Sequence, residues 1–150
     1  MRLNIFNHKF NDFSADLEEK LNLMAEHVLS DQRKHNFNIN LKFVSSSEMT
    51  KLNQNFRNKN LDTNVLSFPA SKEIQEISGE LGDIAMSIPY IKTESQNLNR
   101  DLEDHMMHLL AHGILHLLGF DHNQNKEANT MEAQEIKYLE NFKIANPYKL

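Results

Sequence analysis

Apolar residues along the chain follow two different spacings, and the two alternate from one end of the sequence to the other. Stretches in which every second residue is apolar predict half-buried strands, and apolar residues three or four positions apart predict amphipathic helices. The predicted strands cover residues 2–7, 38–44, 63–68 and 80–86. The predicted helices cover residues 14–30, 46–56, 100–118 and 126–142, with a further helix that opens at residues 87–89. Between them, the polar segments 57–62 and 69–79 are expected as loops.

Capping residues support these boundaries. Ser14 is placed to cap the first helix and Ser46 or Ser47 the second, and Pro89 in a first helical turn loses no hydrogen bond. No repeat or shift in composition divides the sequence, so we expect residues 1–150 to form a single domain. Because strands and helices interleave, the chain is predicted to be an α/β or α+β layer sandwich of four strands and about five helices.

The composition narrows the class of protein. The chain has no cysteine, which excludes a disulfide scaffold, a cysteine-type zinc finger and a thiol nucleophile. No apolar run is long enough for a membrane span and the first ten residues lack the apolar core of a signal peptide, so we expect a soluble, cytoplasmic protein. The net charge of −5 argues weakly against nucleic acid as a partner, although residues 49–72 carry four cationic side chains against Asp62 alone.

One segment, HMMHLLAHGILHLL at residues 105–118, combines apolar residues with histidines and little else. A helix that is apolar around most of its circumference is normally buried, and Met106, Leu110, Ile114 and Leu117 are expected to face the core. The four imidazoles at positions 105, 108, 112 and 116 fall within about 80° of one another on a single stripe. Since a buried polar group without a partner costs about 1–3 kcal/mol, these rings must bind backbone carbonyls, carboxylates, water or a metal.

His112 and His116 are the pair best placed to hold a metal. Four residues apart on a helix, their Cβ atoms lie about 5–6 Å from each other, so both rings can reach one ion. His122 would point about 240° away from His116 if the helix continued, but Gly119 can end the helix and reverse the chain. His108 and His112 have the same spacing, and the bend with His122 beyond it decides between the two pairs.

The same segment contains a second glycine with a structural implication. Gly113 costs about 1 kcal/mol relative to alanine in a helix, which suggests that another group packs close to the backbone there. Three histidines would leave one position for water, the open arrangement of a catalytic zinc site, although imidazoles also suit nickel or copper. Zincin proteases have a Glu where this chain has Gly113, so a small zinc peptidase is disfavoured. His8, His27 and His35 show no such spacing and are expected on the surface.

Three sequence motifs resemble those of the YbeY family, bacterial zinc-dependent endoribonucleases also called rRNA maturation factors. HGILHLLGFDH is similar to the family signature HGxLHLxGYDH, FRNKNLDTNVLSFP resembles the family's Arg, short basic loop and VLSFP segment, and ELGDIAMS resembles its following strand. With motif order and length, the resemblance covers nearly the whole chain. Phe120 departs from the signature, where Tyr or His is common, and the missing hydroxyl could remove a hydrogen bond that supports a ligand.

The resemblance implies an α/β fold with a small mixed sheet and a role for several residues. His112, His116 and His122 would bind one Zn²⁺, and Arg57 would act on the RNA phosphate. Two further groups of residues are expected at the site. Lys59, Asn64 and Ser67 would bind substrate, and His108 and Asp121 would support the ligands from behind. The general base stays open among Glu80, Asp83 and Asp121, and the substrate's 2′-hydroxyl is an alternative nucleophile.

The implied activity is cleavage of single-stranded RNA in maturation of the 16S rRNA 3′ end and in ribosome quality control. The small ribosomal subunit or the 70S ribosome would be the partner, with no membrane and no DNA involved. A ribosome-assembly module with a mainly structural zinc is the alternative. Because the net charge is −5, an RNA-binding cleft requires the acidic side chains to lie on distant helix faces. The residues in question are Asp16, Glu18, Glu19, Glu132 and Glu135.

Overall fold

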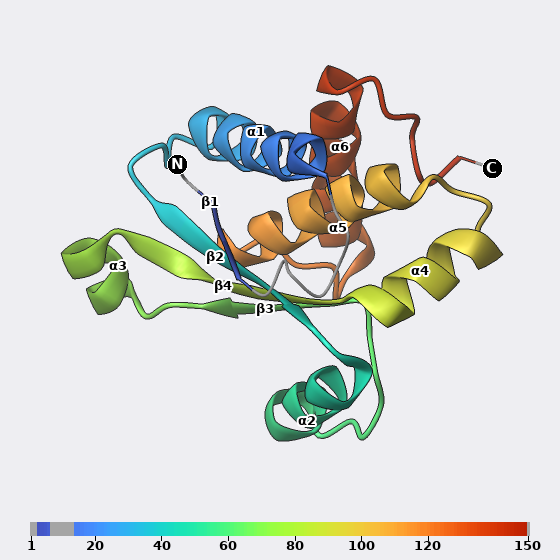
Figure 1. Cartoon of the computed structure of the whole chain (residues 1–150). Helices are drawn as coiled ribbons and strands as arrows, with labels where there is room; N and C mark the ends of the chain where they lie inside the picture. Colours follow the sequence, from blue (N-terminus) through green and yellow to red (C-terminus); the bar gives the residue numbers. More distant parts are fainter. Residues whose placement is uncertain (1–2, 7–13, 150) are drawn as a thin grey trace.

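A four-stranded mixed sheet lies at the centre of the computed structural model, which describes residues 3–6 and 14–149 (Figure 1). Its strands are β1 (Leu3–Phe6), β2 (Asn38–Val44), β3 (Val65–Pro69) and β4 (Glu80–Ser87), in the order β1-β2-β4-β3. β1, β2 and β4 run parallel, and β3 pairs antiparallel with β4. The expected mixed sheet is confirmed. The outer residues of the predicted first strand, Arg2 and Asn7, lie outside the described residues.

In the described part of the chain, six helices surround this sheet. They are α1 (Ala15–Asp31), α2 (Ser46–Arg57), α3 (Lys72–Ser78), α4 (Ile88–Asn97), α5 (Leu102–Leu117) and α6 (Asn125–Asn141). α1, α5 and α6 lie on one side of the sheet and α2 on the other (Figure 1). None of these helices is long and apolar enough to cross a membrane.

The alternation of apolar and polar residues in β2 separates the two sides. Ile39, Leu41 and Phe43 are at most 1% exposed and belong to the main core, on the side of α1 and α5. Lys42 lies on the opposite face and lines an open groove of about 640 Å³ between the sheet and α2. The core face therefore anchors α5, the helix that carries four histidines.

The helix α3 was not predicted, because residues 69–79 were expected as a loop. Ser71 caps it by accepting a hydrogen bond from the Ile74 backbone N–H, and Gly79 ends it in the left-handed conformation. The helix buries no side chain, and Ile77 is 87% exposed. A helix without a buried face has no apolar stripe, which is why the spacing of apolar residues did not indicate it.

The start of α2 also differs from the prediction. Ser45, rather than Ser46 or Ser47, is the N-cap residue. The reason is a capping box: the Glu48 backbone N–H donates to the Ser45 hydroxyl, and the Glu48 carboxylate lies 3.5 Å from the Ser45 backbone nitrogen. The position of Glu48 therefore determines which of the three consecutive serines becomes the N-cap residue.

Candidate metal centre

α5 is buried on almost every side, as its sequence predicts. Met106, Leu110 and Ile114 are fully buried and Leu117 is 4% exposed, so the expected core stripe is confirmed. His105 and His108 are also buried, whereas His112 and His116 are only half-buried. The last two histidines thus lie where the helix meets accessible space.

The bend after α5 is a Schellman motif. The Gly119 N–H donates to the His116 carbonyl at 3.0 Å, and the Phe120 N–H donates to the Leu115 carbonyl at 2.9 Å. Gly119 has φ +99°, and no atom lies within 4 Å of the position that a Cβ would take. The glycine is therefore required for its backbone conformation and not for space.

A second set of hydrogen bonds fixes the turn beyond the glycine. The Asp121 carboxylate accepts from the His122 backbone N–H and from the Asn123 side-chain amide, each at 2.7 Å. Asp121, which was expected to support a ligand, thus bonds to the backbone that carries His122.

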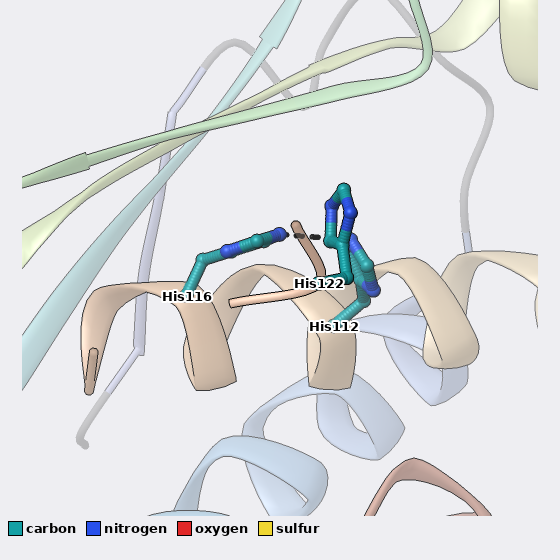
Figure 2. A group of neighbouring side chains, drawn as sticks. All are labelled: His112, His116 and His122. Atoms are coloured by element: carbon teal, nitrogen blue, oxygen red, sulfur yellow. Dashed lines mark hydrogen bonds between the residues drawn. The ribbon is translucent and has the colours of Figure 1, made fainter. Parts of the chain in front are cut away.

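The bend brings the three histidines together (Figure 2). One side-chain nitrogen from each of His112, His116 and His122 lies within 4.8 Å of the others. The ring centroids are 4.6 Å apart for His112 and His116, 4.9 Å for His116 and His122, and 5.6 Å for His112 and His122. Two rings come from one face of α5 and the third from the turn, as the sequence predicts.

A hydrogen bond to His116 and a carboxylate beside His112 indicate which nitrogen of each ring faces the centre. His116 Nδ1 lies 3.0 Å from the Phe120 carbonyl oxygen, which can only accept, so Nδ1 carries the hydrogen. His112 Nδ1 lies 3.3 Å from the Glu135 carboxylate. The two Nε2 atoms therefore direct lone pairs at each other across 3.1 Å. Two zinc–nitrogen bonds of about 2.0–2.1 Å at a tetrahedral angle would place these atoms roughly 3.3–3.4 Å apart.

Protonation of His116 is suppressed in this arrangement. Burial, together with the neighbouring rings of His112 and His122, lowers the pKa of His116 to about 4. The imidazole is consequently neutral near pH 7, the state in which it can bind a metal.

Glu135 was missed by sequence reasoning, which expected it on a distant helix face with Glu132. That expectation is wrong for both residues: they line a cavity of about 250 Å³ together with His112, His122 and Tyr148. The sequence carried a signal for Glu135, because it follows the buried Met131 by four positions and so shares the apolar stripe of α6.

Glu135 is ionised although it is only 1% exposed. Burial by itself would raise its pKa, but hydrogen bonds from His108 and His112 bring the pKa down to about 2. His108, which was expected to support the ligands from behind, contacts the same Glu135 carboxylate as His112. Asp16 and Glu19, in contrast, are exposed on α1.

The residues expected to bind substrate fall into two groups. Arg57 ends α2 and Lys59 follows a left-handed Asn58, and both cationic side chains are exposed. Among the described residues, no hydrogen bond or ion pair joins Arg57 or Lys59 to the three histidines. The Asn64 amide donates to Glu94 at 3.0 Å and its carbonyl accepts from its neighbour's backbone at 2.6 Å, so this side chain is already engaged.

Ser67 connects β3 to α5 between the first two histidines. Its hydroxyl donates to the Gly113 carbonyl at 2.9 Å. A Cβ on Gly113 would lie 3.1 Å from Ile84 Cδ1 and 3.2 Å from Ser67 Oγ. The close packing expected at Gly113 is confirmed, and it presses α5 onto the sheet beside the site.

Two candidates for the general base, Glu80 and Asp83, lie apart from the three histidines, and the third, Asp121, lies in the turn before His122. Asp83 faces the groove on the α2 side and accepts a hydrogen bond from Asn40 at 3.0 Å. Glu80 is exposed at the start of β4. His35 is exposed as expected, and His8 lies outside the described residues. His27 is half-buried and packs edge-on against Tyr138, which corrects its expected surface position.

Comparisons with known proteins agree with this geometry. The family model described as Endoribonuclease YbeY matches residues 4–143. An endoribonuclease YbeY of Francisella tularensis subsp. novicida (strain U112) is 41% identical over 114 residues, covering 73% of this chain and 70% of that protein. The endoribonuclease YbeY of Coxiella burnetii (strain Dugway 5J108-111) is 36% identical over 135 residues, covering 90% and 88%.

A solved structure supports the same relationship. The solution structure of a Thermotoga maritima protein matches with a TM-score of 0.65 at 27% identity, covering 92% of this chain and 87% of that chain. The fold, the histidine motif and the sequence matches thus agree. The chain belongs to the endoribonuclease YbeY family.

Proposed function

We propose that residues 1–150 form one metal-dependent endoribonuclease domain, in which His112, His116 and His122 bind a zinc ion. The observation that carries the proposal is the convergence of the three rings, with the Nε2 atoms of His112 and His116 3.1 Å apart. The contacts at their Nδ1 atoms favour a lone pair on each Nε2. Two acceptors at this distance repel each other unless a cation or a shared proton lies between them. The donor set fits zinc, and it also suits nickel or copper.

Zinc held by three imidazoles keeps a position open and supplies Lewis-acid chemistry, including a water whose pKa falls to about 7. The chain's own groups prepare this site. His116 is kept neutral and is oriented by the Phe120 carbonyl, and the Asp121 carboxylate holds the turn that presents His122. The absence of any backbone or side-chain donor between the rings leaves the lone pairs for a metal, among the residues that the structure describes.

Arg57 is proposed to act on the scissile phosphate. Its exposed guanidinium can bind two phosphate oxygens and neutralise the charge that builds on a five-coordinate phosphorus. Lys59 would follow the backbone of a single strand, since exposed cations in a loop track phosphates. Asn64 and Ser67, whose side chains are bonded to Glu94 and to the Gly113 carbonyl, would assist by shaping the edge of the site.

The proposed substrate is single-stranded RNA, with the 3′ end of 16S rRNA as the physiological target. Family membership and the printed names of the relatives support RNA cleavage. Residues 49–72 contain four cationic side chains and one acidic side chain. This local positive charge supports a phosphate-binding surface on a protein that is acidic as a whole. Such an enzyme would act in the cytoplasm on the small subunit or the 70S ribosome, in rRNA maturation and ribosome quality control, without DNA as a substrate.

Cleavage of a labelled single-stranded RNA by protein freed of contaminating nucleases tests this proposal. His116→Ala should abolish cleavage and the bound zinc, and Arg57→Ala should reduce cleavage while zinc content is unchanged. Lys34→Ala, which removes an equal charge beyond the end of α1, is the matched control and should cleave normally. Undiminished cleavage by either test variant refutes the assignment. An unfolded His116→Ala protein instead supports a structural zinc.

A further inference from the structure

Three side chains contact one carboxylate oxygen behind the histidine cluster. His108 Nε2 lies 2.5 Å from Glu135 Oε1, the Tyr148 hydroxyl donates to the same atom at 2.8 Å, and His112 Nδ1 lies 3.3 Å away. Glu135 comes from α6, His108 and His112 from α5, and Tyr148 from the C-terminal segment. One buried oxygen thus joins three parts of the fold to a ring of the candidate metal centre.

Arg100 determines the direction of the hydrogen bond from His108. A guanidinium can only donate, and its Nη1 lies 3.3 Å from His108 Nδ1 and 3.1 Å from His105 Nδ1. Both Nδ1 atoms therefore accept, and the ring hydrogen of each histidine is on Nε2. His108 Nε2 consequently donates to Glu135, as His105 Nε2 donates to Glu94 at 2.7 Å.

Glu135 also affects which ring nitrogen of His112 carries the hydrogen. The Glu135 Oε1 atom accepts from the Tyr148 hydroxyl and from the His108 ring, and it lies 3.3 Å from His112 Nδ1. An oxygen that already accepts two hydrogen bonds favours a hydrogen on His112 Nδ1, which leaves His112 Nε2 facing His116 at 3.1 Å. His116 obtains the same orientation from a backbone carbonyl, which no side-chain substitution can remove. His112 depends on a side chain. We propose that Glu135 is the positioning residue of His112, and that Tyr148 and His108 hold its carboxylate in place.

This inference rests on the proposed metal-binding role of His112 and adds a residue from outside the histidine motif. A simple structural role for Glu135, joining α6 to α5, is the competing explanation. Carboxylates that accept the second ring hydrogen of a metal-bound histidine typically change metal affinity by 10–100-fold when removed. A structural pair would change the stability of the metal-free protein and leave the affinity alone, so the two explanations separate.

Zinc affinity, measured by competition with a chromophoric chelator, provides the test. Glu135→Gln should weaken zinc binding by about 10–100-fold, because a neutral amide is a poorer acceptor for the His112 ring. Glu94→Gln is the matched control: it alters the equivalent histidine–carboxylate pair at His105, which touches none of the three ligands. It should leave zinc affinity unchanged, whatever its effect on thermal unfolding.

The outcomes distinguish the inference from the proposed function. Wild-type affinity in Glu135→Gln overturns the positioning role while zinc binding by the wild type stands. A wild-type protein that binds no zinc overturns the proposed metal centre itself. If Glu135→Gln does not fold, Tyr148→Phe decides, because it keeps the ring and removes only the hydroxyl that donates to Glu135. Weaker zinc binding then supports the inference, and unchanged binding overturns it.

Discussion

Replacing Gly119 by alanine isolates the contribution of the bend that returns His122 to α5. The residue has φ +99°, and an added Cβ would find no atom within 4 Å. The substitution therefore creates no clash and tests the backbone conformation alone. The bend also carries the Phe120 carbonyl that orients His116, so a shift of this turn affects two of the three candidate ligands.

The size of the effect follows from this geometry. An L-residue in a left-handed conformation costs about 1–2 kcal/mol. Alanine also lowers the conformational entropy of the unfolded chain, which stabilises the folded state by roughly 0.4–1 kcal/mol. The net decrease in the free energy of unfolding is therefore on the order of 1 kcal/mol. For a domain of this size, that corresponds to a decrease in Tm of roughly 2–4 °C.

Thermal unfolding of the metal-free protein and a zinc titration measure the two consequences. Gly79→Ala is the matched control, because Gly79 has φ +73° at the end of α3, and its nearest contact would be ordinary at 3.5 Å. Both variants should lose similar stability, and only Gly119→Ala should bind zinc more weakly. Equal weakening of zinc binding in both variants, or an unchanged Tm in Gly119→Ala, would contradict the proposed role of the bend.

Three further outcomes are expected. Burial and the hydrogen bond to Asp31 raise the pKa of Tyr138 to about 12, so its stabilisation is complete below pH 10 and is lost as the pH rises toward 12. Urea unfolding should show a larger loss in the wild type than in Tyr138→Phe, in which Tyr148, whose pKa is also raised by burial and Glu135, still contributes. Gly82→Ala should lose more than about 3 kcal/mol or fail to fold, because its Cβ would lie 2.5 Å from the Phe68 backbone oxygen, and a normal urea midpoint would contradict the β3–β4 register. Zinc at about 100 times its Kd should add about 2.7 kcal/mol to stability, and a chelator should remove this increment from the wild type but not from His116→Ala.

Much of the fold was predictable because burial determined it. β2 begins and ends at the predicted residues, since alternate side chains such as Leu41 and Phe43 are buried on one face. α3 was missed for the opposite reason: its stability comes from end caps, and Ile74 and Ile77 remain exposed. Periodicity detects elements that contribute to the core and fails for those that do not.

In the candidate site, too, some residues could be predicted from the sequence and others could not. His112, His116 and His122 lie within eleven consecutive residues, so helix period and one glycine bend suffice to bring them together. Glu135 reaches the site only because α6 packs against α5, and that contact depends on the whole fold. The sequence offered one indication of this role, a carboxylate on the otherwise apolar stripe of α6. Single charged residues on helices are common, so this indication alone does not identify Glu135 as a site residue.

Three imidazoles from α5 and its following turn are proposed to hold one metal ion. X-ray absorption spectroscopy on zinc-loaded protein, with metal content measured on the same sample, tests this proposal most directly. We expect one zinc per chain with three imidazole nitrogens at about 2.0–2.1 Å and one exchangeable oxygen, and loss of that signal in His116→Ala. Protein that purifies and reconstitutes without zinc, or an unchanged zinc spectrum in His116→Ala, would contradict it.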